Sequence, residues 1–92
     1  MNGGIAPRMD SIAALGEAIR SRVEAARLED ACELARKRHR EVVALFDDPE
    51  LDRSDDAVAY WLQGLVREDG ELLHSLAELR RRMEFELSES RR

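Results

Sequence analysis

Hydrophobic residues line one helix face over the C-terminal half of the chain. They follow one another at steps of four and three residues, with Asp69 the single polar interruption. The positions are Val58, Leu62, Leu65, Leu72, Leu76, Leu79 and Met83. This spacing is typical of a single amphipathic helix, which we predict over residues 54–89. At 1.5 Å per residue such a helix is about 50 Å long.

Two shorter amphipathic helices are predicted before it, over residues 10–26 and 28–47. The second ends at Asp48-Pro49, because the residue before a proline is disfavoured in the helical region. Ser54 is a suitable N-cap for the third helix. Residues 1–9, which contain Asn2-Gly3-Gly4, are predicted to be a flexible leader, and residues 10–90 a single helical domain.

The junction of the first two helices leaves two architectures open. The hydrophobic phase slips by one residue between Ala26 and Ala31, and Glu29 and Asp30 suit the first turn of a new helix. No glycine or proline lies there, so residues 10–47 could also form one helix. The sequence therefore favours an all-α antiparallel bundle of three helices with a long third helix. The alternative is a two-helix long hairpin that dimerises into a four-helix bundle.

The third helix is predicted to be longer than the helices that cover it. Residues beyond about 73 would then project, leaving Leu73, Leu76, Leu79, Met83 and Leu87 without a partner in the chain. A buried acid must be paired, so Asp69 is expected to pair with an arginine such as Arg38 or Arg22. The predicted partner-binding residues are Leu65, Asp69, Leu72, Leu73, Leu76, Leu79, Arg80 and Met83.

Composition narrows the functional classes. The chain has 92 residues, of which 38% are charged and 4% aromatic, and its net charge is −5. An acidic balance argues against a general nucleic-acid binder. The basic run Arg36–Arg40 is interpreted as a solvated helix face, or as a contact with an anionic surface or with the acidic stretch 47–56 of a second copy. The lone Cys32 allows no intrachain disulfide, and no apolar run approaches a membrane span, so a cytoplasmic location is predicted.

Residues suited to catalysis or metal binding are sparse. His39 and His74 have no histidine or cysteine three or four residues away, which a helical metal site would use. Glu71 and His74 form one Glu-x-x-His pair, whereas di-iron bundles need two such pairs. Small helical chorismate mutases have a similar length, but their acid-rich N-terminal helix is missing and Lys37 is the only lysine. We predict no enzymatic activity, no cofactor and no metal.

The order of these features resembles the flagellar export chaperones of the FliT family. The similarity covers residues 10 to about 90. It is carried by Glu24–Glu29, by Glu33-Leu34 with Arg38, by Asp48-Pro49, and by Leu65–Leu73 leading into Leu79-Arg80. Two features depart from the family pattern: Leu28 stands where a tryptophan is usual, and a fourth, C-terminal helix has no counterpart.

The resemblance implies a small cytoplasmic chaperone that binds an amphipathic helix of the filament-cap protein and delivers this cargo to the export ATPase. Apolar anchors at i, i+3, i+4 and i+7 suit such helix-in-groove binding. Leu72, Leu76, Leu79 and Met83 would be the anchors, and Arg80 and Arg82 would steer acidic partners. The alternative is an obligate homodimeric scaffold or regulatory adaptor without chaperone activity.

Overall fold

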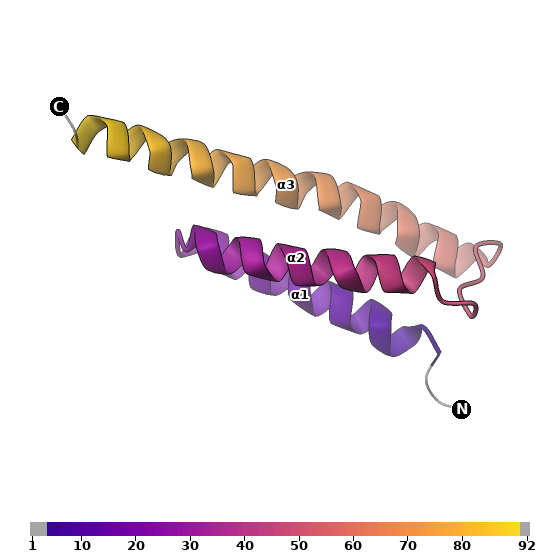
Figure 1. Ribbon diagram of the computed structural model, residues 1–92. Helices are drawn as coiled ribbons and strands as arrows, with labels where there is room; N and C mark the ends of the chain where they lie inside the picture. Colours follow the sequence, from indigo (N-terminus) through magenta and orange to yellow (C-terminus); the bar gives the residue numbers. More distant parts are fainter. Residues whose placement is uncertain (1–3, 91–92) are drawn as a thin grey trace.

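The computed structural model describes residues 4–90, which form three helices. They are α1 (Ala6–Glu24), α2 (Leu28–Phe46) and α3 (Asp56–Ser90). The first two form an antiparallel hairpin, and the much longer α3 runs back along it and past its end (Figure 1). The molecule is accordingly elongated, with extents of 59 × 21 × 18 Å. The all-α fold of three helices with a long third helix is confirmed.

A tight turn separates α1 from α2, so the alternative of one helix over residues 10–47 is wrong. Ala26 adopts a left-handed conformation with φ of 58°. The N–H of Arg27 donates to the carbonyl of Arg22 at 2.8 Å, and the N–H of Ala26 donates to that of Val23 at 3.0 Å. These two bonds form a Schellman motif, in which the left-handed position is usually glycine. An alanine there explains why the sequence shows no clear break.

The helix boundaries differ from the expected ones by a few residues. The first helix begins at Ala6 rather than at residue 10, because Pro7 is well suited to a first turn. Residues 6–9 of the expected leader are therefore helical, while residues 1–3 lie outside the described part. Asp55, rather than Ser54, caps α3: its Oδ1 accepts the N–H groups of Ala57 at 2.8 Å and of Val58 at 3.2 Å.

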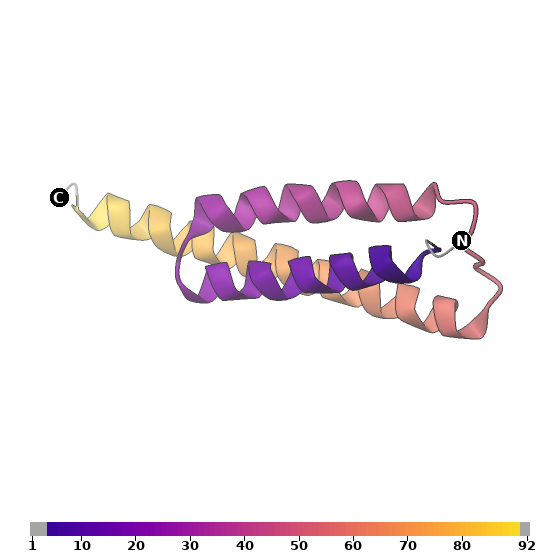
Figure 2. The ribbon, with the colours of Figure 1, turned by 90° about the horizontal axis from the view of Figure 1, so that it is seen from below.

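Two small hydrophobic clusters hold the three helices together. Each cluster takes one buried residue from each helix. The first contains Ile12, Leu45 and Leu65, and the second contains Ile19, Ala31 and Leu72. The stripe on α3 therefore faces the hairpin. Figure 2 shows the hairpin and α3 from below, with the C-terminal part of α3 extending past the hairpin.

The hairpin covers more of α3 than its sequence suggests. Leu79, expected to lack a partner, is only 1% exposed. Leu76 is partly buried against the second cluster, and Met83 is half-buried. Leu73 and Leu87 do remain exposed, at 60% and 58%. The expectation of uncovered leucines thus holds for two positions that lie off the stripe, because the stripe itself turns inward as far as Leu79.

Candidate functional site: a groove between α2 and α3

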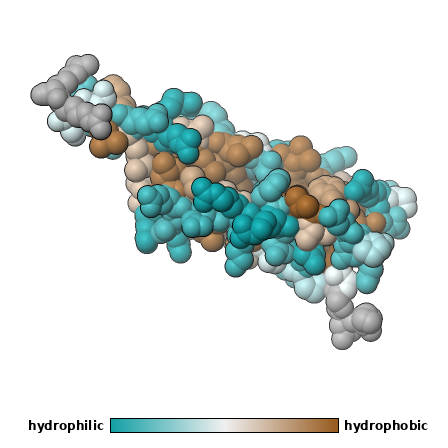
Figure 3. All heavy atoms as spheres, viewed as in Figure 1, coloured by the Kyte–Doolittle hydropathy of each residue, from teal (hydrophilic) through white to brown (hydrophobic). Residues whose placement is uncertain are grey.

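An apolar groove of about 820 Å³ lies between α2 and α3. Figure 3 shows it as a hydrophobic area between these two helices, flanked by hydrophilic residues. Apolar side chains from both helices provide most of its lining. They are Ala35, Val42, Phe46, Leu65, Val66, Leu72, Leu73 and Leu76, with Ile19 of α1 also contributing.

The groove exists because the helices pack unequally. The first two helices are in close contact along their lengths, whereas α3 approaches each of them at few places. On α3, the side chains of Val66 and Leu73 are seven residues apart and therefore lie on one line of the helix surface. They are 70% and 60% exposed, and Phe46 on the opposite wall is 39% exposed. Buried leucines thus form the base of the groove, and exposed apolar residues form its edges.

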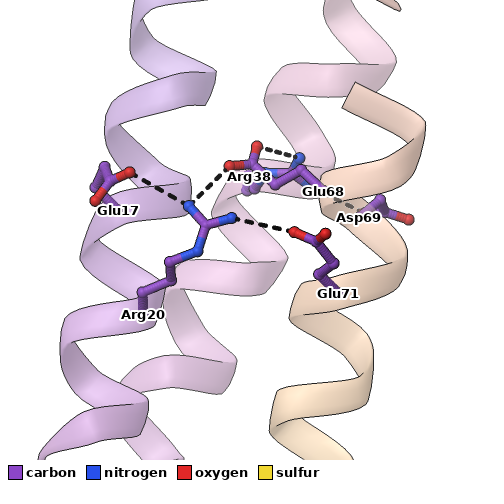
Figure 4. A network of polar contacts seen from close by, with 6 residues as sticks. All are labelled: Glu17, Arg20, Arg38, Glu68, Asp69 and Glu71. Carbon is purple, nitrogen blue, oxygen red and sulfur yellow. Dashed lines mark hydrogen bonds and ion pairs between the residues drawn. The ribbon is translucent and has the colours of Figure 1, made fainter. Parts of the chain in front are cut away.

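A buried arginine joins the two walls at mid-length. Arg38 is only 3% exposed. Its Nη1 donates to Asp69 Oδ1 at 2.8 Å and its Nη2 to Glu68 Oε1 at 3.1 Å (Figure 4). Asp69 was predicted to pair with Arg38 or Arg22, and Arg38 is its partner. The expectation of a buried acid is wrong, because the Asp69 side chain is 57% exposed and the arginine is the buried member of the pair. The Nε of Arg38 is buried without a partner among residues 4–90.

Glu68 extends this network to α1. Its Oε2 accepts a hydrogen bond from Arg20 Nη1 at 3.0 Å, so one carboxylate bridges arginines of α1 and α2. Arg20 also lies 3.6 Å from Glu71 and 3.3 Å from Glu17. A Cβ at Gly16 would come within 2.9 Å of Glu68 Oε2, so the glycine leaves room for this carboxylate.

The bridge through Glu68 was not predicted from the sequence. The residue that could have indicated it is Gly16, which lies on the apolar face of the first helix between Leu15 and Ile19. A glycine at such a position indicates a close approach of another group. The signal does not name the approaching residue, because that depends on the register between α1 and α3.

The edge of the groove on α2 is basic. It carries Arg36, His39 and Arg40. Arg36 makes a long, exposed ion pair with Glu33 at 3.8 Å. His39 and Arg40 form no hydrogen bond or ion pair with any residue in the described range 4–90. This basic edge differs from the predicted one, which placed Arg80 and Arg82 beside the binding face.

Neither of those two arginines lines the groove. Arg80 borders a neighbouring depression at the start of α2, which it lines together with Leu28, Cys32 and Arg36. Arg82 lies on the projecting end of α3, beside Phe85. The neighbouring Arg81 donates to Glu78 at 2.7 Å, and this hydrogen bond and the arginine charge lower the pKa of the Glu78 carboxyl.

The structure divides the eight predicted partner-binding residues into two groups. Five of them line the groove: Leu65, Asp69, Leu72, Leu73 and Leu76. The other three, Leu79, Arg80 and Met83, lie outside it. Within the first group Leu73 is the most accessible hydrophobic side chain, because Leu65 and Leu72 are buried and Leu76 is partly buried in the core.

Among residues 4–90, no three histidine, cysteine, aspartate or glutamate side chains are grouped in a way that could hold a metal ion. No helix in that range has the length and apolar character that crossing a membrane requires. No family model, curated protein or solved structure matches the chain.

Proposed function

We propose that this protein binds an amphipathic helix of another protein in the groove between α2 and α3. The observation that carries the proposal is the contiguous apolar lining of the groove, with Val66 and Leu73 largely exposed on one wall and Phe46 partly exposed on the other. Exposed apolar residues that gather on one surface often mark an interaction site.

A helix is the occupant that fits the shape of the groove. Both walls are helices, and a further helix laid between them would complete a four-helix bundle. The α2 wall presents Ala35, His39, Val42 and Phe46 at steps of four and three residues. That line spans about 16 Å at 1.5 Å per residue, so a partner helix of three turns would reach from end to end.

Within this class, a cytoplasmic flagellar export chaperone of the FliT type is the specific function that we propose. The resemblance of residues 10–90 to that family supports this proposal, and so does the agreement between the groove and helix-in-groove recognition of a cargo protein. The cargo would be the amphipathic helix of a filament-cap protein. We further propose that the protein acts by binding and not by catalysis.

The test is binding of a designed helical peptide of about 18 residues, with leucines on one face and glutamines beside them, to wild type and to two variants. Leu73→Asp places a charge on the groove wall, and Leu87→Asp is a matched change on the projecting end of α3. We expect Leu73→Asp to lose binding and Leu87→Asp to retain it, with unchanged helix content by circular dichroism. Equal binding by both variants would contradict the proposal.

A homodimeric scaffold is the second candidate, favoured by a different surface. Beyond the hairpin, α3 exposes Phe85 at 65% and Leu87 at 58%. A second copy packed on this end would cover them. Sedimentation over a concentration series tests the idea: an obligate dimer stays dimeric at nanomolar concentration, and its unfolding midpoint rises with protein concentration. A monomer at all concentrations would exclude it.

A further inference from the structure

We infer that the helix that occupies the groove carries carboxylates along the flank that faces α2. The inference rests on the proposed function and adds the charge pattern of the partner and its orientation about its own axis. It comes from the unequal charge of the two groove walls.

All ionisable groups on the groove lining show the same asymmetry. From α2 come Arg36, Arg38, His39 and Arg40, and from α3 comes Asp69. The residue that α1 contributes, Ile19, is apolar. Every ionisable residue of the α2 wall is therefore basic, and the one ionisable residue of the α3 wall is an acid.

The pairing inside the groove leaves the α2 edge with unbalanced positive charge. Arg38 and Asp69 neutralise one another at 2.8 Å, and the second amino group of Arg38 reaches Glu68. Arg40 has no ion-pair partner within residues 4–90, and Arg36 has only the distant Glu33. Complementary charge across an interface fixes its register and speeds association, so acids opposite Arg36 and Arg40 satisfy both requirements.

The spacing of these arginines sets the spacing of the acids. Residues four apart on a helix have their Cβ atoms about 5–6 Å from one another along the same face. Two carboxylates three or four residues apart on the partner helix would therefore lie opposite the two guanidinium groups. The apolar stripe of the partner would point toward Leu73 and Phe46 at the same time.

The projecting end of a second copy fits this pattern poorly. Residues 80–90 contain Glu84, Glu86 and Glu89, but Arg80, Arg81 and Arg82 precede them. This segment carries no net charge, and laying it in the groove would bring some of its arginines against the basic wall. We therefore assign the groove to a helix from a different protein.

The inference can be tested with three peptides that share one leucine face and differ in their flanks. One peptide carries glutamate at two flank positions four residues apart, one carries glutamine there, and one carries lysine. With wild-type protein at low salt we expect the glutamate peptide to bind about five-fold more tightly than the glutamine peptide, which corresponds to two exposed ion pairs. The lysine peptide should bind more weakly than both.

Two double variants locate the effect. Arg36→Gln/Arg40→Gln removes the basic edge, and Arg81→Gln/Arg82→Gln removes the same charge from the projecting end of α3. The preference for glutamate should disappear in the first variant, persist in the second, and weaken in wild type as salt screens it.

The outcomes separate the inference from the proposed function. If all three peptides bind wild type equally, or if the preference survives in Arg36→Gln/Arg40→Gln, the charge inference is overturned while groove binding stands. If none of the peptides binds, groove binding itself fails. If the protein dimerises and dimerisation excludes the peptides, the groove belongs to a second copy and the inference is overturned.

Discussion

Helix α2 packs closely against α1 on one side and only loosely against α3 on the other. Toward α1, the helices pack closely and the tight turn at Ala26 joins them. Toward α3, contact is sparse, and the space between the helices is partly occupied by Arg38 with its carboxylate partners and partly left as a groove. The face of α2 toward α1 is closely packed, and the face toward α3 borders an open groove.

This difference shows how a short chain can combine a stable fold with an accessible apolar surface. The clusters around Ile12 and Ile19 each join all three helices, so α3 is anchored without closing against α2 over its length. The Arg38–Glu68–Arg20 bridge fixes the position of α3 by polar contacts in the middle. Val66 and Leu73 on the edge of the groove therefore stay exposed while α3 is held in place.

The largest expected effect on the free energy of unfolding is at Leu72, and it should be absent at the adjacent Leu73. Leu72 is 4% exposed in the core, and Leu73 is 60% exposed on the groove edge. Leu72→Ala should lower the free energy of unfolding by about 2–5 kcal/mol, whereas Leu73→Ala should change it by less than about 0.5 kcal/mol. Urea denaturation measures both. A comparable loss for the two variants would mean that Leu73 is also part of the core.

Removing the arginine that joins α2 to α3 should have the next largest effect. Arg38→Ala leaves Glu68 without one of its two arginines and opens space between the helices, so we expect a loss of about 2 kcal/mol. Arg36→Ala, one half-turn earlier and exposed, is the matched control and should cost almost nothing. Equal urea midpoints for the two variants would show that the buried network contributes no stability.

Gly16 provides a test of how α1 accommodates Glu68. Gly16→Ala gains helix propensity of about 1 kcal/mol but pushes the added Cβ against the Glu68 carboxylate. We expect little or no stabilisation in wild type and about 1 kcal/mol in a Glu68→Ala background, where the obstacle is gone. Double-mutant thermal or urea unfolding gives this coupling. Strictly additive effects would place the carboxylate elsewhere.

The turn between α1 and α2 offers a smaller, stabilising change. Ala26→Gly relieves a left-handed alanine at φ of 58° and should raise the free energy of unfolding by about 0.5–1 kcal/mol. Ala25→Gly is the control, because Ala25 has φ of −86° and gains nothing from glycine. Unfolding midpoints that move down together in both variants would argue for a continuous helix through the junction.

The smallest expected effect lies in the loop before α3. Ser54 donates hydrogen bonds from its hydroxyl at 2.6 Å and its backbone N–H at 3.0 Å to Asp52 Oδ1, and these bonds lower the pKa of the Asp52 carboxyl. Because the lowered pKa belongs to the folded state, the associated stability is present at neutral pH and is lost as the pH falls through that pKa. Ser54→Ala should raise the pKa of Asp52 toward its ordinary value in an NMR titration; an unchanged pKa would contradict the hydrogen bonds.

The spacing of hydrophobic residues was sufficient to predict the helices and to show which face of α3 packs against the hairpin. Proline and acidic residues marked the end of the second helix and the start of the third. The turn at Ala26 was only partly visible, because an alanine in a left-handed conformation has no sequence signature. The sequence indicated the pairing of Asp69 with an arginine, since an acid on an apolar stripe needs a partner.

The groove itself could not be predicted, because it depends on the distance between α2 and α3. Periodicity describes each helix alone and does not show how closely two helices approach. For the same reason Leu79 was expected to be uncovered, although the end of the hairpin reaches it. The basic run at residues 36–40 was interpreted as a solvated face or as a contact with an anionic surface or a second copy. Arg36, His39 and Arg40 are indeed exposed and lie on the groove edge, whereas Arg38 is buried, so the solvated interpretation is wrong for that residue.

The most direct test of helix binding in the groove between α2 and α3 is an NMR titration of ¹⁵N-labelled protein with the glutamate-flanked peptide. Chemical-shift changes should concentrate in residues 35–46 of α2 and 65–76 of α3, with little change in the outer face of α1 or in residues 80–90. Changes confined to residues 80–90, or an absence of changes at saturating peptide, would contradict a helix-binding groove between α2 and α3.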